Sequence, residues 1–132
     1  MLSTGTPAAG SSPLLDRTEL RRVMALGAST VEQRAELGQF FTPAPVAELM
    51  ASLVDVRRLP TNVRLLDPGA GVGSLTAAVV NRLVAEDAPP RILNVAAYEI
   101  DPRLLEDLDA TLAECAAVAE AAGAADELPG AT

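Results

Sequence analysis

The sequence predicts an α/β fold in which two parallel strands are flanked by helices. Three features support this prediction. A short β-rich run at residues 63–67 leads directly into a glycine loop at 68–73, and a second β-rich run follows at 92–100 after a helical pattern. Two strands joined through a helix normally lie parallel, with a right-handed crossover. Both apolar runs are expected to be buried strands of one α/β unit.

Two helices are predicted before this unit, over residues 14–38. The second starts near Thr30, because Thr30 and Gln33 have the spacing of a capping box, in which each side chain satisfies the other's free backbone N–H. It is expected to end at Gly38. The first helix is predicted over residues 14–26, and its apolar stripe consists of Leu15, Leu20, Val23, Met24 and Leu26.

A third helix is predicted after the segment G-Q-F-F-T-P at residues 38–43. Thr42 stands where an N-cap is expected, and Pro43 suits the first helical position. The helix has the i, i+3, i+4, i+7, i+8 pattern of one buried face. Its apolar positions are Val46, Leu49, Met50, Leu53 and Val54.

Two further helices belong to the α/β unit, which is predicted to span residues 39–122. One covers residues 74–85. The other is capped and started by Asp101 and Pro102. Residues 1–13 are expected to form a disordered tail because Ser, Gly, Pro and Ala dominate them, and residues 123–132 are expected to form an acidic, loop-like tail.

The glycine loop carries the chemistry of the sequence. Residues 67–74 read D-P-G-A-G-V-G-S. Alternating glycines let the chain turn sharply and let a ligand touch bare backbone. Glu99, at the end of the second strand, can accept hydrogen bonds from both hydroxyls of a ribose. A lone glycine triplet is more often a structural turn, but the order strand, loop, helix, strand and acid favours a nucleoside site.

The loop excludes some nucleotides. A P-loop requires a lysine, and the sequence contains none. A dinucleotide loop requires Gly or Ala where Ser74 stands, and its acid lies closer to the loop than Glu99 does. Asp67 would repel a pyrophosphate. A cofactor with a sulfonium and an α-amino group, both positive, suits it better.

These motifs resemble those of class I S-adenosylmethionine-dependent methyltransferases. The glycine loop with its D-P opening is similar to that of the amino-methyltransferases that act on DNA bases. Glu99-Ile100-Asp101 resembles the acidic second motif of the family. The segment at 38–43 resembles the motif that precedes the loop in the adenine-N6 branch, which is common in restriction–modification enzymes.

The resemblance implies a partial Rossmann-like class I methyltransferase fold and S-adenosylmethionine as the cofactor. It implies that Thr42 and Pro43 form a wall at the methionine end and that Glu99 holds the ribose. The remaining implied cofactor residues are Asp67, Pro68, Gly69, Ala70, Gly71, Gly73 and Ile100. The N-P-P-Y-type motif that would accept the target amine does not occur in this sequence, so no catalytic residue is assigned and the chain alone is predicted to be inactive.

Charge and composition bear on the partners. The net charge of −8 disfavours direct DNA binding by this segment. DNA is therefore expected to be bound through regions missing from this chain, and the other expected partners are a restriction nuclease or the rest of a methyltransferase. Neither a signal peptide nor a membrane span is expected, which indicates a cytoplasmic protein. Two alternatives stay open: a methyltransferase for RNA, protein or a small molecule, and a non-catalytic cofactor-binding or scaffold subunit.

Overall fold

The computed structural model describes residues 12–125, and most of both predicted tails lies outside them. The described helices and strands are α1 (Pro13–Ala28), α2 (Val31–Leu37), α3 (Ala44–Ser52), β1 (Asn62–Pro68), α4 (Ser74–Val84), β2 (Ile92–Tyr98) and α5 (Leu105–Ala121), with 3-10 turns at Val56–Arg58 and Pro102–Leu104. In this part of the chain no helix is long and apolar enough to cross a membrane.

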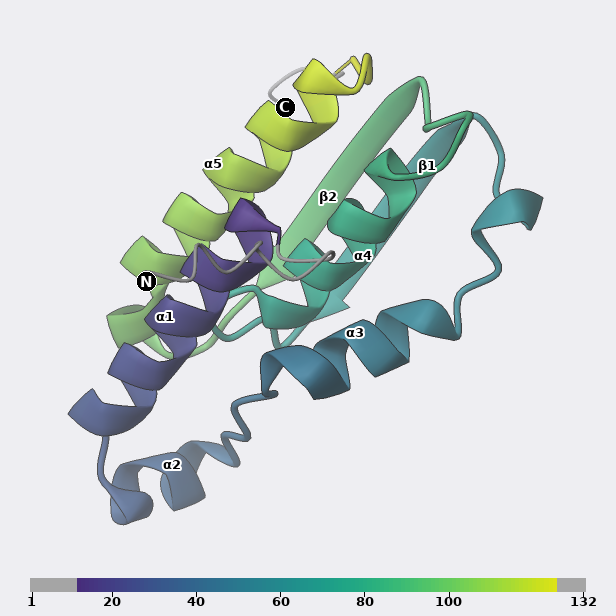
Figure 1. The fold of residues 1–132 in the computed structure, drawn as a ribbon. Helices are drawn as coiled ribbons and strands as arrows, with labels where there is room; N and C mark the ends of the chain where they lie inside the picture. Colours follow the sequence, from purple (N-terminus) through teal and green to yellow (C-terminus); the bar gives the residue numbers. More distant parts are fainter. Residues whose placement is uncertain (1–11, 126–132) are drawn as a thin grey trace, which may run out of the picture.

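The predicted α/β arrangement is confirmed. Strands β1 and β2 pair in parallel, with Asn62 opposite Ile92 and Pro68 opposite Tyr98. Helix α4 connects the two strands, and Figure 1 shows α1, α4 and α5 together on one face of the two-stranded sheet. After α5 the chain returns to the sheet, because Ala125 forms an isolated parallel bridge to Ile92.

Residues 12–125 cover only one face of the sheet, which corrects the expectation of buried strands. Val63 and Leu93 point toward the helices and are each 7% exposed. On the opposite face Leu66 is 62% and Tyr98 is 66% exposed. Burial alternates along the strands because successive side chains point to opposite faces and the helices that pack on the sheet lie on one of them.

Helix α4 forms the centre of the core. It packs against α1, α3 and α5, and six of its residues are buried, namely Thr76, Ala77, Ala78, Val79, Val80 and Leu83. The alanines have small side chains, so neighbouring helices can approach α4 closely. The predicted helix at 74–85 is therefore confirmed to within one residue at its end.

The capping box of α2 is confirmed, and so is its end. Thr30 accepts a hydrogen bond from the Gln33 backbone at 3.1 Å, and the Gln33 side chain accepts one from the Thr30 backbone at 2.9 Å. Gly38 ends the helix with a φ of 61°, in the left-handed region that favours glycine.

The predicted apolar stripe of α1 is largely wrong. The helix starts at Pro13 with Ser12 as N-cap, and its buried residues are Leu14, Leu15 and Thr18. Arg21 continues this face and donates to Thr111 and Glu114 of α5. The side of α1 that meets α5 is therefore polar beyond its first turn. The rest of the predicted stripe is exposed, and its members are Leu20, Val23, Met24 and Leu26.

Helix α3 starts one residue later than predicted, and Thr42 is not its N-cap. Pro43 occupies the N-cap position and provides no side-chain cap. The carboxylate of Glu19 in α1 accepts from the Ala44 backbone N–H at 3.2 Å instead. An acidic group at a helix N-terminus satisfies a free N–H and opposes the helix dipole, so the cap of α3 comes from a distant part of the sequence.

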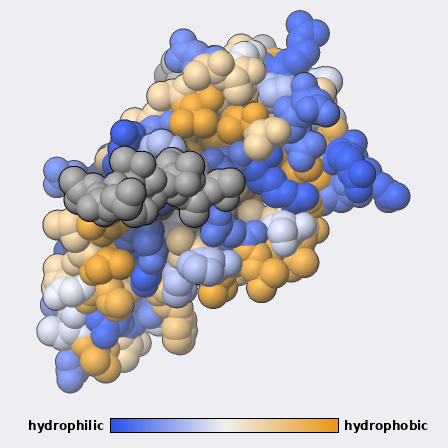
Figure 2. Space-filling view, viewed as in Figure 1, coloured by the Kyte–Doolittle hydropathy of each residue, from blue (hydrophilic) through white to orange (hydrophobic). Residues whose placement is uncertain are grey.

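The predicted buried face of α3 is also wrong. Ala47 and Ala51 are the residues of α3 that are buried, and α3 packs against α4. Arg82 of α4 donates to the carbonyls of Ala51 and Val54 and so holds the end of α3. The larger apolar side chains gather on the outer surface over α3 (Figure 2), and they are Val46, Leu49, Met50 and Leu53.

The burial of the core beside α5 can be tested with Cys115, the single cysteine of the sequence. Burial raises the pKa of the Cys115 thiol to about 12, and the residue is 3% exposed. Because the thiolate is the reactive form, labelling of the native chain at pH 8 should be at least about a hundredfold slower than labelling of the urea-unfolded chain. The measurement is the rate of iodoacetamide modification by mass spectrometry. Equal rates would contradict a closed core around α5.

Candidate nucleoside-binding site

The glycine loop lies between the end of β1 and the start of α4. Gly69, Gly71 and Gly73 have φ values of 136°, 57° and 92°, which other residues rarely adopt. The predicted sharp turn is therefore present at the carboxyl end of the sheet, where ligands of open α/β sheets are bound.

The glycines of the loop have different surroundings. A Cβ atom at Gly73 would lie 2.7 Å from the Thr111 methyl of α5. A Cβ atom at Gly69 or at Gly71 would meet no atom within 4 Å. Gly73 is thus required where the loop packs against α5, whereas Gly69 and Gly71 leave open space above the backbone.

The first part of the loop is fixed to the end of β2. The backbone N–H groups of Gly69 and Ala70 both donate to the Tyr98 carbonyl at 2.9 Å. Ala70 is 8% exposed, so its side chain belongs to the protein interior. Pro68, at the end of β1, is exposed. These bonds place the loop directly beside the residues that follow β2.

Glu99 is the first residue after β2 and lies over the loop. Its Oε2 atom accepts from the Gly71 N–H at 2.7 Å, and its Oε1 atom accepts from the Asp101 N–H at 2.9 Å. A carboxylate offers about four lone-pair sites, so Glu99 can accept further hydrogen bonds. Ile100, its neighbour, is 77% exposed.

Asp67 is held by a residue that the sequence analysis did not identify. The Thr76 hydroxyl donates to its Oδ2 atom at 2.7 Å, and Thr76 is 1% exposed. A hydroxyl in the first turn of the helix after the loop is the sequence signal that could have indicated this partner. The bond fixes the Asp67 carboxylate at the strand end.

Asp101 connects this region to the segment before α3. The Arg103 guanidinium bonds its carboxylate at 2.8–3.2 Å and holds the pKa of Asp101 well below its usual range. The Gln39 amide also donates to Asp101, at 2.7 Å. The ion pair stabilises the fold above the pKa of an unfolded aspartate, about 3.9, and this stability is lost only as pH falls below that value. Asp101 was predicted to cap the long helix that follows it, but it caps the 3-10 turn at Pro102–Leu104, and α5 begins only at Leu105.

Thr42 and Pro43 belong to the segment before α3, whereas the other predicted site residues belong to the ends of β1 and β2 and to the glycine loop. Within residues 12–125 neither side chain has a hydrogen bond to the glycine loop. Asp67, the glycines, Glu99 and Ile100 are brought together by the ends of β1 and β2. Gln39 links the two groups and was not among the predicted site residues, although it lies within the motif at residues 38–43.

The local charge of the site is negative. Asp67 and Glu99 end neighbouring strands, and Arg103, the cation nearest to them in the hydrogen-bond network, is committed to Asp101. Two carboxylates favour a ligand that carries positive charge and hydroxyl donors, and they disfavour a phosphate.

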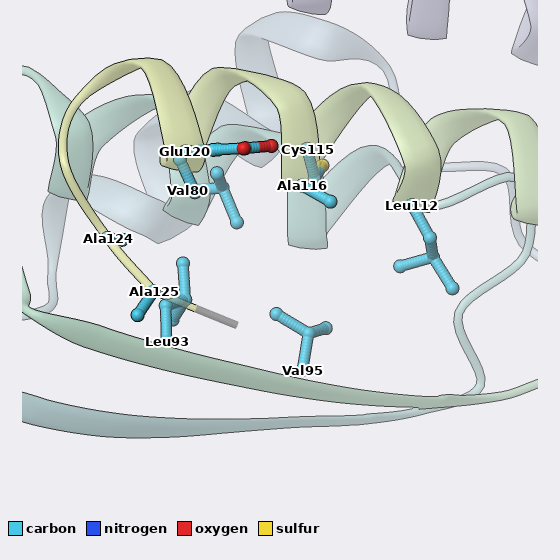
Figure 3. Close-up of a pocket in the computed structure, with 10 residues that line it drawn as sticks. Val80, Leu93, Val95, Leu112, Cys115, Ala116, Glu120, Ala124 and Ala125 are labelled. Atoms are coloured by element: carbon cyan, nitrogen blue, oxygen red, sulfur yellow. The ribbon is translucent and has the colours of Figure 1, made fainter. Parts of the chain in front are cut away.

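A separate cleft lies elsewhere in the described part of the chain. It has a volume of about 550 Å³ and lies between β2 and α5, where Leu93, Val95 and Leu112 point into it (Figure 3) and Cys115 contributes to its wall. Its lining is apolar apart from Glu120. Leu93 is near the start of β2, whereas the glycine loop bonds Tyr98 at its end. The cleft therefore does not form part of the glycine-loop site.

Comparison with known proteins gives consistent matches over this region. The family model described as N-6 DNA methylase matches residues 24–103. The type II methyltransferase M.BsuBI of Bacillus subtilis is 42% identical over 83 residues, which are 63% of this chain and 16% of that protein. The type II methyltransferase M.PstI of Providencia stuartii is 37% identical over 89 residues, 66% of this chain and 17% of that protein. No solved structure gave a significant match. The matched part of the chain thus spans about a sixth of these relatives.

Proposed function

Because the chain belongs to the N-6 DNA methylase family, we propose that residues 39–122 bind S-adenosylmethionine as part of a DNA adenine-N6 methyltransferase. The observation that carries this proposal is the hydrogen bond between the Gly71 N–H and Glu99. It joins the glycine loop to Glu99, the proposed ribose acceptor, at the carboxyl end of the sheet. Residues 14–38 would support this unit as N-terminal helices.

The described residues fit this cofactor. Glu99 would accept hydrogen bonds from the ribose hydroxyls, and Ile100 offers an exposed apolar surface beside it. Gly69 and Gly71 leave room for a ligand against the backbone. Asp67 would face the positive methionine end, which Thr42 and Pro43 would border.

Three predicted contact residues have different proposed roles. Gly73 packs against α5, and the side chain of Ala70 is buried. Pro68 ends β1. We assign these residues to the shape of the loop, with Gly69, Gly71 and Glu99 as its ligand-facing members.

The proposed substrate is an adenine amino group in DNA. S-adenosylmethionine supplies an electrophilic methyl group when it is bound, and the residues of this chain bind and orient it. Enzymes of this type take the target base out of the duplex before they modify it.

The net charge of −8 supports DNA contact through other regions of a longer enzyme. We propose that the chain alone does not transfer methyl groups, that it acts in the cytoplasm, and that its partner is a restriction nuclease or the rest of a methyltransferase.

A competition experiment tests the cofactor. S-adenosylmethionine or its demethylated product should bind at least about tenfold more tightly than NAD, a difference of roughly 1.4 kcal/mol. The reason is that Asp67 and Glu99 attract a cationic ligand and repel a pyrophosphate. Isothermal titration calorimetry of the 132-residue chain measures both affinities.

The variant Asp67→Asn is the matched control. It removes one negative charge and keeps the size of the side chain, so the preference for S-adenosylmethionine over NAD should decrease. Equal binding of both ligands by the original chain would indicate a dinucleotide site and contradict the proposal.

A further inference from the structure

Gln39 is placed so that it can connect the two ends of the proposed site. It follows the C-cap residue of α2, and its backbone N–H donates to the Arg34 carbonyl at 2.8 Å. Its side-chain amide reaches across to Asp101, with 2.7 Å between Nε2 and Oδ2. The two residues are 62 positions apart in the sequence.

The path continues from Asp101 to the glycine loop. The Asp101 N–H donates to Glu99, and Glu99 accepts from the Gly71 N–H. Asp101 is 2% exposed, and Arg103 holds the same carboxylate. A hydrogen bond to an ionised group is stronger and shorter than one between neutral groups. The Asp101 carboxylate therefore holds the Gln39 side chain firmly, close to Glu99.

The amide orientation of Gln39 is set by this contact. An ionised carboxylate can only accept, so the amide nitrogen has to face Asp101. The Gln39 Oε1 atom is buried and has no partner in the described part of the chain. An unmet buried acceptor is unfavourable, which indicates that the bond to Asp101, and not the surroundings of Oε1, determines how the side chain lies.

We infer that Gln39 is a positioning residue that holds the segment 39–43 against the turn at residues 99–101. Among residues 12–125 its bond to Asp101 is the one hydrogen bond between these two segments. Phe40 is 93% exposed and does not anchor the segment. The inference rests on the proposed function, since it concerns how Thr42 and Pro43 are kept at the methionine end while Glu99 holds the ribose.

The test is the variant Gln39→Met, which keeps the length of the side chain and removes the donor. Two ligands are titrated by calorimetry. S-adenosylmethionine has the nucleoside and the amino-acid part, whereas 5′-methylthioadenosine lacks the amino-acid part. The variant should bind S-adenosylmethionine roughly tenfold more weakly and bind 5′-methylthioadenosine within about twofold of the original chain.

If Gln39 only stabilised the fold, Gln39→Met would weaken the binding of both ligands to the same extent. Equal weakening of both ligands, or unchanged binding of S-adenosylmethionine, would overturn the inference. Gln39→Lys restores a donor toward Asp101 and should recover most of the lost affinity. If Gln39→Met does not fold, Gln39→Asn replaces it: this amide is one methylene shorter and cannot reach Asp101, so the same selective loss is expected.

Failure of the proposed function would be distinguishable. If the original chain bound neither ligand, or bound S-adenosylmethionine but not 5′-methylthioadenosine, the nucleoside site at Glu99 would be wrong. If the original chain bound both and Gln39→Met behaved identically, the role of Gln39 alone would be wrong.

Discussion

Replacement of Glu99 by alanine should weaken the binding of S-adenosylmethionine by at least about tenfold. A hydrogen bond to a charged acceptor contributes about 1.5–3 kcal/mol, and Glu99 is the charged acceptor proposed for the ribose hydroxyls. The variant also removes the partner of the Gly71 N–H, so the loop loses the bond that aligns it. Calorimetric titration measures the loss.

The variant Glu99→Gln is the matched control. It keeps the side-chain shape and one acceptor oxygen but loses the charge, so its affinity should fall between those of the original chain and Glu99→Ala. A thermal melt of each variant establishes that it is folded before titration. Unchanged affinity of folded Glu99→Ala would remove Glu99 from the site.

Replacement of Gly73 by alanine should lower the free energy of unfolding by about 2–5 kcal/mol. A non-glycine residue in the left-handed region costs roughly 1–2 kcal/mol, and overpacking adds roughly 1–3 kcal/mol. Both apply, because Gly73 has a φ of 92° and its Cβ atom would lie 2.7 Å from the Thr111 methyl. Urea denaturation followed by circular dichroism measures the change.

Two further variants separate the cost of a positive φ from the cost of the steric clash with Thr111. Gly71→Ala has the strain of a positive φ but no atom within 4 Å of the new Cβ, so it should cost no more than about 2 kcal/mol. Thr111→Ser removes the methyl group that Gly73→Ala meets and keeps the hydroxyl that Arg21 contacts. Adding it to Gly73→Ala should therefore recover part of the loss. Equal destabilisation by Gly73→Ala and Gly71→Ala would mean that α5 moves to accommodate the methyl group added at residue 73.

The parts of the fold that follow from local chemistry could be predicted from the sequence. The capping box of Thr30, the end of α2 at Gly38 and the turn at the three loop glycines each depend on residues close together in the chain. The parallel pairing of β1 and β2 follows from the helix between them, which returns the chain to the end of the sheet where the first strand began.

The surfaces that each helix buries could not be predicted in the same way. Periodicity shows that Val46, Leu49 and Met50 share a face of α3, but it does not show that a partner covers that face, and α3 uses Ala47 and Ala51 against α4 instead. The cap of α3 depends on a carboxylate from α1. Such contacts are set by tertiary packing and leave no local signal.

The candidate site was predictable in its residue types but not in its connections. The sequence placed a glycine loop and an acid at the ends of two strands, and the fold brings them within 2.7 Å. The contact of Gln39 with Asp101 was not predicted, because the two residues are 62 positions apart and their proximity depends on the packing of the helices. The bond from Thr76 to Asp67 is more local, and the hydroxyl in the first turn of α4 was the signal that could have indicated it.

The shared use of the Tyr98 carbonyl by the Gly69 and Ala70 N–H groups links ligand binding to folding. The loop takes its shape only when β1 and β2 are paired, so the unfolded chain has no comparable site. A ligand that binds only the native state adds RT ln(1 + [L]/Kd) to its stability, which is about 2.7 kcal/mol at a hundredfold excess over Kd. For a two-stranded sheet of which residues 12–125 cover one face, a cofactor bound at this loop would act as a part of the fold.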